Sequence, residues 1–137
     1  MTKFSFFLLF VSLLASMINA QKSWGAGFLN NNQCNIASLF YNDGQKSPDF
    51  DKLFIECPPN TGKILNIHLN PCIGVNDGQM KWNTQKPFFR RKCYGCRVDQ
   101  YALSCSCVAN NGTIIHGSRL GLNMGISLVN GKLVCHN

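Results

Sequence analysis

The sequence predicts a small all-β domain that is braced by disulfides and built from two copies of one unit. Three observations support this prediction. Eight cysteines occur among 137 residues, which is well above the usage of ordinary globular chains. Apolar and polar residues alternate along short segments that are separated by Asn-Gly or Asp-Gly pairs. The order of these segments in the first half of the chain recurs in the second half.

The composition is that of one globular domain with an excess of positive charge. Apolar residues make up 45% of the chain and charged residues only 14%, and the length suits a single domain. Thirteen Lys and Arg residues stand against six Asp and Glu residues, which gives a net charge of +7. These values exclude a coiled coil, a collagen-like chain and a protein with several membrane spans.

The first twenty residues have the pattern of a secretory signal peptide. Lys3 supplies the positive charge, an apolar stretch runs from Phe4 to Ala15, and Ala20 suits a cleavage site. The apolar stretch is shorter than the roughly 20 residues that a membrane span needs. We therefore expect a signal peptide over residues 1–20, a secreted, extracellular domain over residues 21–137, and no membrane span.

The cysteines are expected to form up to four disulfides, because a secreted chain matures in an oxidising compartment. Their number alone leaves the pairing open. The spacing of Cys93 and Cys96, with Cys105 and Cys107 behind them, is also a spacing of zinc ligands. An exported chain meets oxidant before it meets spare zinc, so we expect no metal and no cofactor.

The local pattern is that of short strands and tight turns. Leu65, Ile67 and Leu69 alternate with Asn66 and His68, which is the period of a half-buried strand. Hairpin turns favour Asn-Gly and Asp-Gly pairs because they need positive φ. Such pairs occur at Asp43-Gly44, Asp77-Gly78, Asn111-Gly112 and Asn130-Gly131.

Two repeats account for nearly all of the predicted domain. Residues 73–82 align with residues 126–135, and residues 53–57 align with residues 103–107. The first repeat therefore covers about residues 28–82 and the second about residues 88–135. One unit of roughly fifty residues has too few apolar positions for a core of its own, so we expect the two units to share one.

This ordered double series resembles the cyanovirin-N homology family of small lectins. Each unit has a Cys, a Leu-x-x-x-Cys segment, a Leu-Asn pair, an Ile and an Asn-Gly or Asp-Gly turn, and the first repeat ends on an aromatic residue. The matching residues are Cys34, Leu53, Cys57, Leu69, Asn70, Ile73, Asp77, Gly78, Trp82, Phe89, Cys93, Leu103, Cys107, Leu122, Asn123, Ile126, Asn130 and Gly131. The resemblance implies a cyanovirin-like pseudo-symmetric fold in which each half is a three-stranded sheet plus a β-hairpin and contains parts of both repeats.

The resemblance also implies a disulfide pattern. By the family's rule Cys34 pairs with Cys57, and Cys93 pairs with Cys107. Cys96 and Cys105 would then lie nearly opposite each other on the hairpin that Cys93 and Cys107 close, which leaves Cys72 to pair with Cys135. The exchanged pairing, Cys93 with Cys105 and Cys96 with Cys107, is a competing alternative.

The function that the resemblance implies is non-catalytic binding of oligosaccharides or glycoproteins, of mannose type. Because paired-repeat folds can swap domains, we expect a monomer or a domain-swapped dimer. The family places one site in each half. Carried over by position, the first candidate site consists of Asn76, Asp77, Arg91, Lys92 and Asn110. The second candidate site consists of Asn32, Gln33, Asn60 and Asn130.

Two other classes of function stay open. The first is a secreted binding protein on the same fold that has lost sugar affinity and contacts a protein or an anionic surface. Val75, Arg91 and Leu128 stand where lectins of the family place other contacting residues, and a basic cluster is formed by Lys86, Arg90, Arg91, Lys92 and Arg97. The second is a small basic ribonuclease, for which His68, His116 and His136 would supply acid and base. Their spacing does not favour it, and we expect no nucleic-acid partner.

One glycosylation sequon occurs, at Asn111-Gly112-Thr113. It falls on a predicted hairpin tip beside Asn110 of the first candidate site. A glycan on Asn111 could obstruct that site in a eukaryotic host.

Overall fold

The computed structural model describes residues 27–30, 32–82 and 85–136. The predicted signal peptide, residues 1–20, lies outside the described residues, as do residues 21–26. The described chain is all β apart from two short 3-10 turns, which confirms the predicted fold class. In order, its elements are β1 (Asn35–Tyr41), β2 (Lys52–Glu56), β3 (Ile64–His68), β4 (Ile73–Asn76), β5 (Gln79–Trp82), η1 (Phe89–Arg91), β6 (Cys93–Asp99), β7 (Ala102–Val108), β8 (Ile114–Gly121), η2 (Leu122–Met124), β9 (Ile126–Val129) and β10 (Lys132–Cys135).

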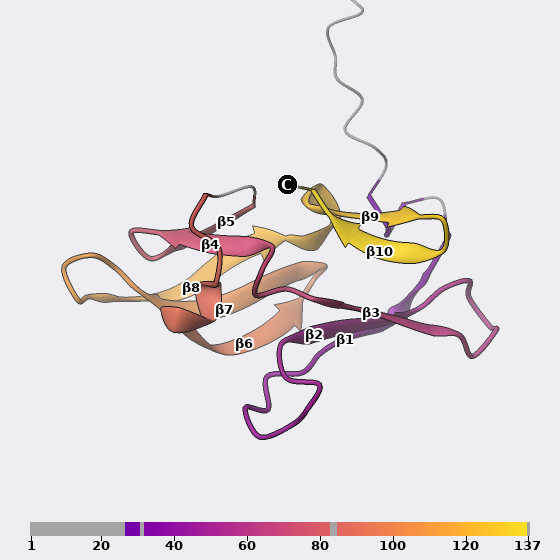
Figure 1. The fold of residues 1–137 in the computed structure, drawn as a ribbon, viewed down its shortest axis with the longest axis horizontal. Helices are drawn as coiled ribbons and strands as arrows, with labels where there is room; N and C mark the ends of the chain where they lie inside the picture. Colours follow the sequence, from indigo (N-terminus) through magenta and orange to yellow (C-terminus); the bar gives the residue numbers. More distant parts are fainter. Residues whose placement is uncertain (1–26, 31, 83–84, 137) are drawn as a thin grey trace, which may run out of the picture.

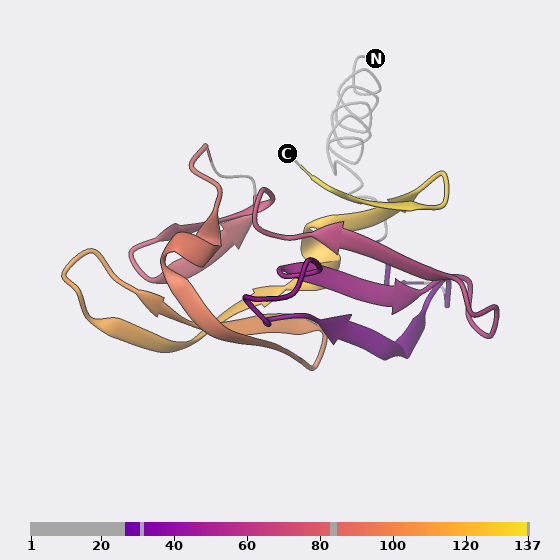
Figure 2. The same ribbon diagram turned by 60° about the horizontal axis from the view of Figure 1, so that its bottom comes forward.

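The strands form four small antiparallel sheets that follow the two repeats. The first repeat gives the sheet β1-β2-β3 and the hairpin β4-β5, and the second gives the sheet β6-β7-β8 and the hairpin β9-β10. Figure 1 shows that each hairpin lies over the sheet of the other repeat: β4-β5 over β6-β7-β8, and β9-β10 over β1-β2-β3. The turned view in Figure 2 shows the same arrangement. Each half therefore contains parts of both repeats.

Hydrogen bonds hold the β4-β5 hairpin of the first repeat against the β6-β7-β8 sheet of the second repeat. The backbone N–H of Met80 donates to Ser118 Oγ of β8 at 3.0 Å, and the indole Nε1–H of Trp82 donates to the carbonyl of Gly121 at 2.9 Å. Ser118 is almost fully buried, so its hydroxyl is satisfied within this contact. The β4-β5 hairpin is consequently an integral part of the second half.

Both short hairpins close through the residue pairs that the sequence singles out. Asp77 and Gly78 have φ of +47° and +81°, and Asn130 and Gly131 have φ of +50° and +73°. Positive φ at both central residues is the type I′ geometry that matches the twist of paired strands. Asp43-Gly44 behaves differently: it lies in a long loop between β1 and β2, and neither residue has positive φ. The prediction of a tight turn there is wrong.

The two repeats share one core, and residues at equivalent positions fill it. Leu53 and Leu103, Leu69 and Leu122, and Ile73 and Ile126 are all fully buried in one cluster. Burying six such side chains contributes about 1.5–3 kcal/mol each. Phe28 and Phe89, each lying shortly before the first Cys of a repeat, complete the core.

The repeat Asn residues hold these phenylalanine segments in place. Asn70 Oδ1 accepts a hydrogen bond from the backbone N–H of Arg90 at 3.0 Å, and Asn123 Oδ1 accepts one from Leu29 at 2.9 Å. Each acceptor belongs to a Leu-Asn pair and each donor follows a buried Phe. The Leu-Asn pairs therefore anchor the chain that leads into each repeat.

The disulfides join Cys34 to Cys57, Cys72 to Cys135, Cys93 to Cys107, and Cys96 to Cys105. This is the pairing favoured above, and the exchanged pairing does not form. The pairing register passes from Tyr94 opposite Ser106 to Arg97 opposite Ser104. Two residues of β6 thus face one residue of β7, and this bulge brings Cys96 to Cys105. Every cysteine is paired in one of these four disulfides, including the four whose spacing is also that of zinc ligands.

The position of the Cys72–Cys135 disulfide has an equivalent in the other half, where two residues pack against each other and form no covalent bond. In the repeat alignment Trp82 corresponds to Cys135, and Gly125 corresponds to Cys72. The Trp82 ring lies so close to Gly125 that a Cβ on residue 125 would overlap the ring. Equivalent positions of the two halves are therefore joined by a disulfide in one half and by packing of the Trp82 ring on Gly125 in the other.

Asp51 is the buried carboxylate of the first half. Its Oδ1 accepts a hydrogen bond from the Tyr41 hydroxyl at 2.8 Å, and its Oδ2 accepts one from the backbone N–H of Asn70. Burial raises the pKa of Asp51 despite these bonds. Burial and the Asp51 charge also raise the pKa of Tyr41, so its hydroxyl stays protonated as the donor.

We predict that this carboxylate makes the protein less stable as the pH rises. A group whose pKa is higher in the folded state binds its proton more tightly there, so the free energy of unfolding falls from about pH 4 upward through the raised pKa. The variant Asp51→Asn, which keeps the shape of the side chain, should lose this dependence. Urea unfolding of both proteins at acidic and neutral pH checks this. Parallel curves of stability against pH would contradict it.

Candidate functional site

The first predicted set of residues lines one cleft. All five of its members, Asn76, Asp77, Arg91, Lys92 and Asn110, border an open pocket of about 420 Å³. Val75, Lys86, Pro87 and Phe88 complete the lining. The volume is within the range of small-ligand sites. The structure therefore brings together residues from three separate segments of the chain.

The tip of the β4-β5 hairpin forms one wall of the cleft. Asn76 ends β4, and Asp77 begins the turn, where its Oδ1 accepts a hydrogen bond from the backbone N–H of Asn110 at 2.9 Å. A Cβ on Gly78 would lie 2.5 Å from Ile115 Cγ1 of β8. Only a glycine lets the turn approach β8 this closely at positive φ. The turn of the first repeat is thus held in place by contacts with Asn110 and Ile115 of the second repeat.

The segment before β6 forms the opposite wall. Gly74 pairs with Pro87 in an isolated bridge, which ties this segment to β4. Phe88 has φ of +77° and is 41% exposed, and the Arg91 guanidinium carbon lies 5.0 Å from the centre of its ring. This is cation–π distance. Phe88 therefore offers the cleft an aromatic surface and positions Arg91.

Arg90 does not belong to this surface. Its side chain is only 6% exposed, and it forms an ion pair with Asp43 in which Nη1 and Oδ1 are 2.6 Å apart. The basic cluster predicted from Lys86, Arg90, Arg91, Lys92 and Arg97 is thus divided, because the 3-10 turn of η1 directs neighbouring side chains to different sides. The cleft receives Lys86, Arg91 and Lys92 from it.

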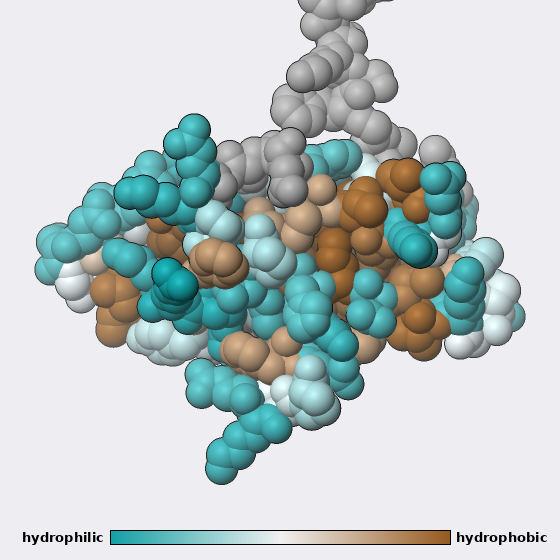
Figure 3. Space-filling model, viewed as in Figure 1, coloured by the Kyte–Doolittle hydropathy of each residue, from teal (hydrophilic) through white to brown (hydrophobic). Residues whose placement is uncertain are grey.

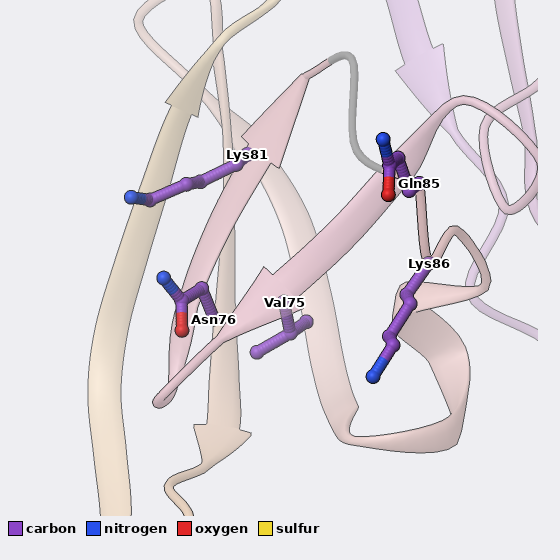
Figure 4. Close-up of a pocket in the computed structure, with 5 residues that line it drawn as sticks. All are labelled: Val75, Asn76, Lys81, Gln85 and Lys86. Carbon is purple, nitrogen blue, oxygen red and sulfur yellow. The ribbon is translucent and has the colours of Figure 1, made fainter.

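A second pocket of about 380 Å³ adjoins the first and shares Val75, Asn76 and Lys86 with it. Its remaining lining residues are Lys81 of β5 and Gln85. Figure 4 shows Val75 and Asn76 between the side chains of Lys81 and Lys86. The two pockets lie side by side along the hairpin, and we refer to them together as the β4-β5 cleft.

The β4-β5 cleft is rich in hydrogen-bonding groups of positive or neutral charge. Its amides are those of Asn76, Gln85 and Asn110, and among the described lining residues Asp77 is the one carboxylate. Four Lys and Arg side chains border it. Such groups can donate to hydroxyl or anionic oxygens. Pro87 and Phe88 line the cleft as well, although neither was among the predicted site residues.

The second predicted set forms a looser arrangement. Asn32, Gln33, Asn60 and Asn130 are all exposed, and no hydrogen bond found among the described residues joins their side chains. Asn130 lies at the β9-β10 turn and Asn60 in the loop between β2 and β3. These segments lie at the end of the molecule opposite the tip of β4-β5 (Figures 1 and 2).

The two ends also differ in surface character. Exposed apolar side chains near the second set are Ile64, Val129 and Val134. Figure 3 shows brown, apolar surface over β3, β9 and β10, whereas the end with the tip of β4-β5 is largely teal. On the face seen in Figure 3, the first end is therefore the more polar of the two.

The three histidines lie on separate segments. His116 Nδ1 is 3.1 Å from Ser106 Oγ, and His136 Nε2 is 2.7 Å from Ser127 Oγ. His68 is the last residue of β3. In the described part of the chain, no three His, Cys, Asp or Glu side chains gather where they could hold a metal ion.

Asn111 is exposed in the loop between β7 and β8, next to Asn110 of the cleft. Its Oδ1 accepts a hydrogen bond from the backbone N–H of Thr113 at 2.9 Å.

No helix within the described ranges is long and apolar enough to cross a membrane.

Comparisons with known proteins agree with this architecture. The family model of the CVNH domain matches residues 34–134. The NMR structure of a CVNH protein from Gibberella zeae is 19% identical, with a TM-score of 0.58 over 75% of this chain and 93% of that chain. The structure of a CVNH protein from T. borchii is 20% identical, with a TM-score of 0.57 over 76% and 95%.

Two further structures of this fold contain sugars. A MoCVNH3 variant in complex with (N-GlcNAc)4 is 16% identical, with a TM-score of 0.59 over 82% of this chain and 99% of that chain. The microvirin:mannobiose complex is 24% identical, with a TM-score of 0.54 over 76% and 94%. No match to the sequence was found among curated proteins.

Proposed function

Because the chain belongs to the CVNH domain family, we propose that it is a secreted, non-catalytic lectin that binds an oligosaccharide in the β4-β5 cleft. The observation that carries this proposal is the convergence of Asn76, Asp77, Arg91, Lys92 and Asn110 on one cleft. Two structures of the same fold hold N-acetylglucosamine or mannose units, so these sugars are the first to test.

The lining suits a sugar because it combines planar polar groups with one aromatic face. The amides of Asn76 and Asn110 can each donate and accept, which matches adjacent hydroxyls. The part of the Phe88 ring that Arg91 leaves open offers an apolar surface to the C–H face of a pyranose. A glycosidase of the common kind uses a pair of carboxylates, and the described lining has Asp77 alone. The arrangement therefore favours binding without hydrolysis.

We predict that Asn76→Ala weakens oligosaccharide binding by about tenfold, because a lost pair of hydrogen bonds costs about 1.4 kcal/mol or more. The test is a glycan array probed with the oxidised protein, followed by calorimetry on the glycan that binds most tightly. Gln33→Ala, which removes an exposed amide of the second candidate set at the opposite end, is the matched control. It should leave binding unchanged if the β4-β5 cleft holds the sugar.

Two outcomes would contradict the proposal. If Gln33→Ala weakens binding and Asn76→Ala does not, the sugar occupies the other end. If no glycan binds to protein shown to be folded, the alternative of a binding protein that contacts a protein or an anionic surface gains support.

Secretion and modification are part of the proposal. We predict that the chain expressed in eukaryotic cells appears in the medium with a glycan on Asn111, since the sequon is exposed on a loop. Mass spectrometry should show a loss of mass on enzymatic deglycosylation, and Asn111→Gln should abolish this loss. An unmodified wild-type protein in the medium would contradict the modification, and intracellular retention would contradict secretion.

A further inference from the structure

The acidic residues of the protein are all engaged within the fold. Of the six in the sequence, three form ion pairs: Asp43 with Arg90, Asp49 with Lys52, and Asp99 with Arg119. The other three carboxylates accept hydrogen bonds. Their donors are Tyr41 and Asn70 for Asp51, Asn35 and Gly62 for Glu56, and Asn110 for Asp77. The excess of positive charge therefore remains at the surface.

A large share of this excess is concentrated in the β4-β5 cleft. Arg91 and Lys92 border its first pocket and Lys81 its second, and Lys86 borders both. The ion pairs of the described residues involve Lys52, Arg90 and Arg119, so Lys81, Arg91 and Lys92 take part in none of them. Like charges collected in a hollow raise the local concentration of anions.

One of these cations is already oriented. The face of Phe88 lies against the Arg91 guanidinium, which leaves the guanidinium edge to donate to a ligand. A guanidinium donates in a planar fork that matches carboxylate, sulfate or phosphate oxygens. The neutral amides of Asn76 and Asn110 line the same pocket, where they can form hydrogen bonds with the hydroxyls of the sugar ring.

From this arrangement we infer that the β4-β5 cleft selects acidic oligosaccharides, whose carboxylate or sulfate groups bind Arg91 and Lys92. The inference rests on the proposed function and specifies its substrate class. A neutral sugar can offer only hydroxyls to these cations, whereas an anionic oxygen forms the shorter and stronger charge-assisted hydrogen bond. Binding of the acidic ligand is therefore expected to weaken with salt, because both partners lie in an open, hydrated cleft.

The experiment is titration calorimetry of the oxidised protein with three probes of equal length. Mannotetraose is neutral, tetragalacturonic acid carries carboxylates alone, and a heparin tetrasaccharide carries sulfates as well. At low ionic strength we expect at least one acidic probe to bind about tenfold or more tightly than mannotetraose, as one charge-assisted bond would give. The two acidic probes distinguish carboxylate recognition from sulfate recognition.

Variants locate the effect in the cleft. The double variant Arg91→Gln/Lys92→Gln should lose about tenfold or more of the affinity for the acidic probe. The double variant Lys46→Gln/Arg97→Gln removes the same charge from exposed positions outside the cleft, and it should change affinity by about twofold at most, through long-range attraction. Equal losses in the two double variants would overturn the inference, since they would indicate attraction by net charge alone.

The failure of this inference is distinguishable from the failure of the proposed function. If mannotetraose or another neutral glycan binds at least as tightly as both acidic probes, the acidic selectivity is wrong and the lectin proposal stands. If none of the three probes binds and the glycan array is also empty, both are wrong.

Discussion

Replacing Cys72 and Cys135 together with serine should lower the free energy of unfolding by about 4 kcal/mol. This disulfide joins residues 63 positions apart, and the entropy that a cross-link removes from the unfolded chain grows with the length of the loop it closes. It also connects the segment before β4 to the end of β10, so it fastens the first repeat to the second.

The matched control is the double variant Cys96→Ser/Cys105→Ser. Its disulfide closes only 9 positions within a hairpin that Cys93 and Cys107 already close, so its removal should cost no more than about 2 kcal/mol. Guanidinium unfolding of both variants without reductant, followed by tryptophan fluorescence, gives the comparison. If Cys96→Ser/Cys105→Ser lowers the free energy of unfolding more than Cys72→Ser/Cys135→Ser does, the link between the repeats is not the more stabilising of the two disulfides.

Replacing Asp43 with asparagine should cost about 3 kcal/mol, because the change leaves the Arg90 charge buried without its partner. Arg90 packs its guanidinium over Phe50, with Cζ 4.8 Å from the ring centre, and donates to Cys96 Sγ at 3.0 Å. Asp43 Oδ2 also accepts the backbone N–H of Cys96 at 3.1 Å. The ion pair thus holds the β1-β2 loop of the first repeat against the entry to the second.

Asp49→Asn serves as the control for this prediction. Its ion pair with Lys52 has the same kind of partners, but the Asp49 side chain is 51% exposed, so the loss should be below about 1 kcal/mol. Urea unfolding at neutral pH measures both variants. If Asp43→Asn is no more destabilising than Asp49→Asn, the Arg90 side chain is not held by this carboxylate.

Local patterns, and their recurrence in the two repeats, allowed much of the fold to be predicted. The hairpins at Asp77-Gly78 and Asn130-Gly131 follow from backbone conformations that few other residue pairs adopt. The shared core follows from apolar residues that recur at matching positions of the repeats, such as Leu53 and Leu103. These signals are local or periodic, so a single sequence displays them.

Other features depend on contacts between residues that are distant in the sequence. Asp43-Gly44 has the composition of a tight turn, yet the Asp43 carboxylate is taken by Arg90 and by the backbone of Cys96. The orientation of Arg90 away from Arg91 follows from the single turn of η1, whose direction is set by the burial of Phe89. Tertiary packing decides such cases, and propensity alone does not anticipate it.

The candidate site was predicted in part. The residues of the first set meet in one cleft because the repeats exchange hairpins, which the family resemblance implied. The aromatic wall at Phe88 was missed because positive φ is uncommon for a bulky residue and carries no signal in the sequence. The second set lies on exposed segments at the opposite end, and its role in binding remains a prediction.

The most direct test of a sugar site in the β4-β5 cleft is an NMR titration of the ¹⁵N-labelled, oxidised protein with the oligosaccharide that binds most tightly. A sugar bound in this cleft should give saturable shifts of the amide signals of Asn76, Asp77 and Asn110. The indole signal of Trp82, which packs against Gly125 and lines neither pocket, should shift far less. Saturable shifts confined to Asn32, Gln33, Asn60 and Asn130, or no shifts at saturating ligand, would contradict it.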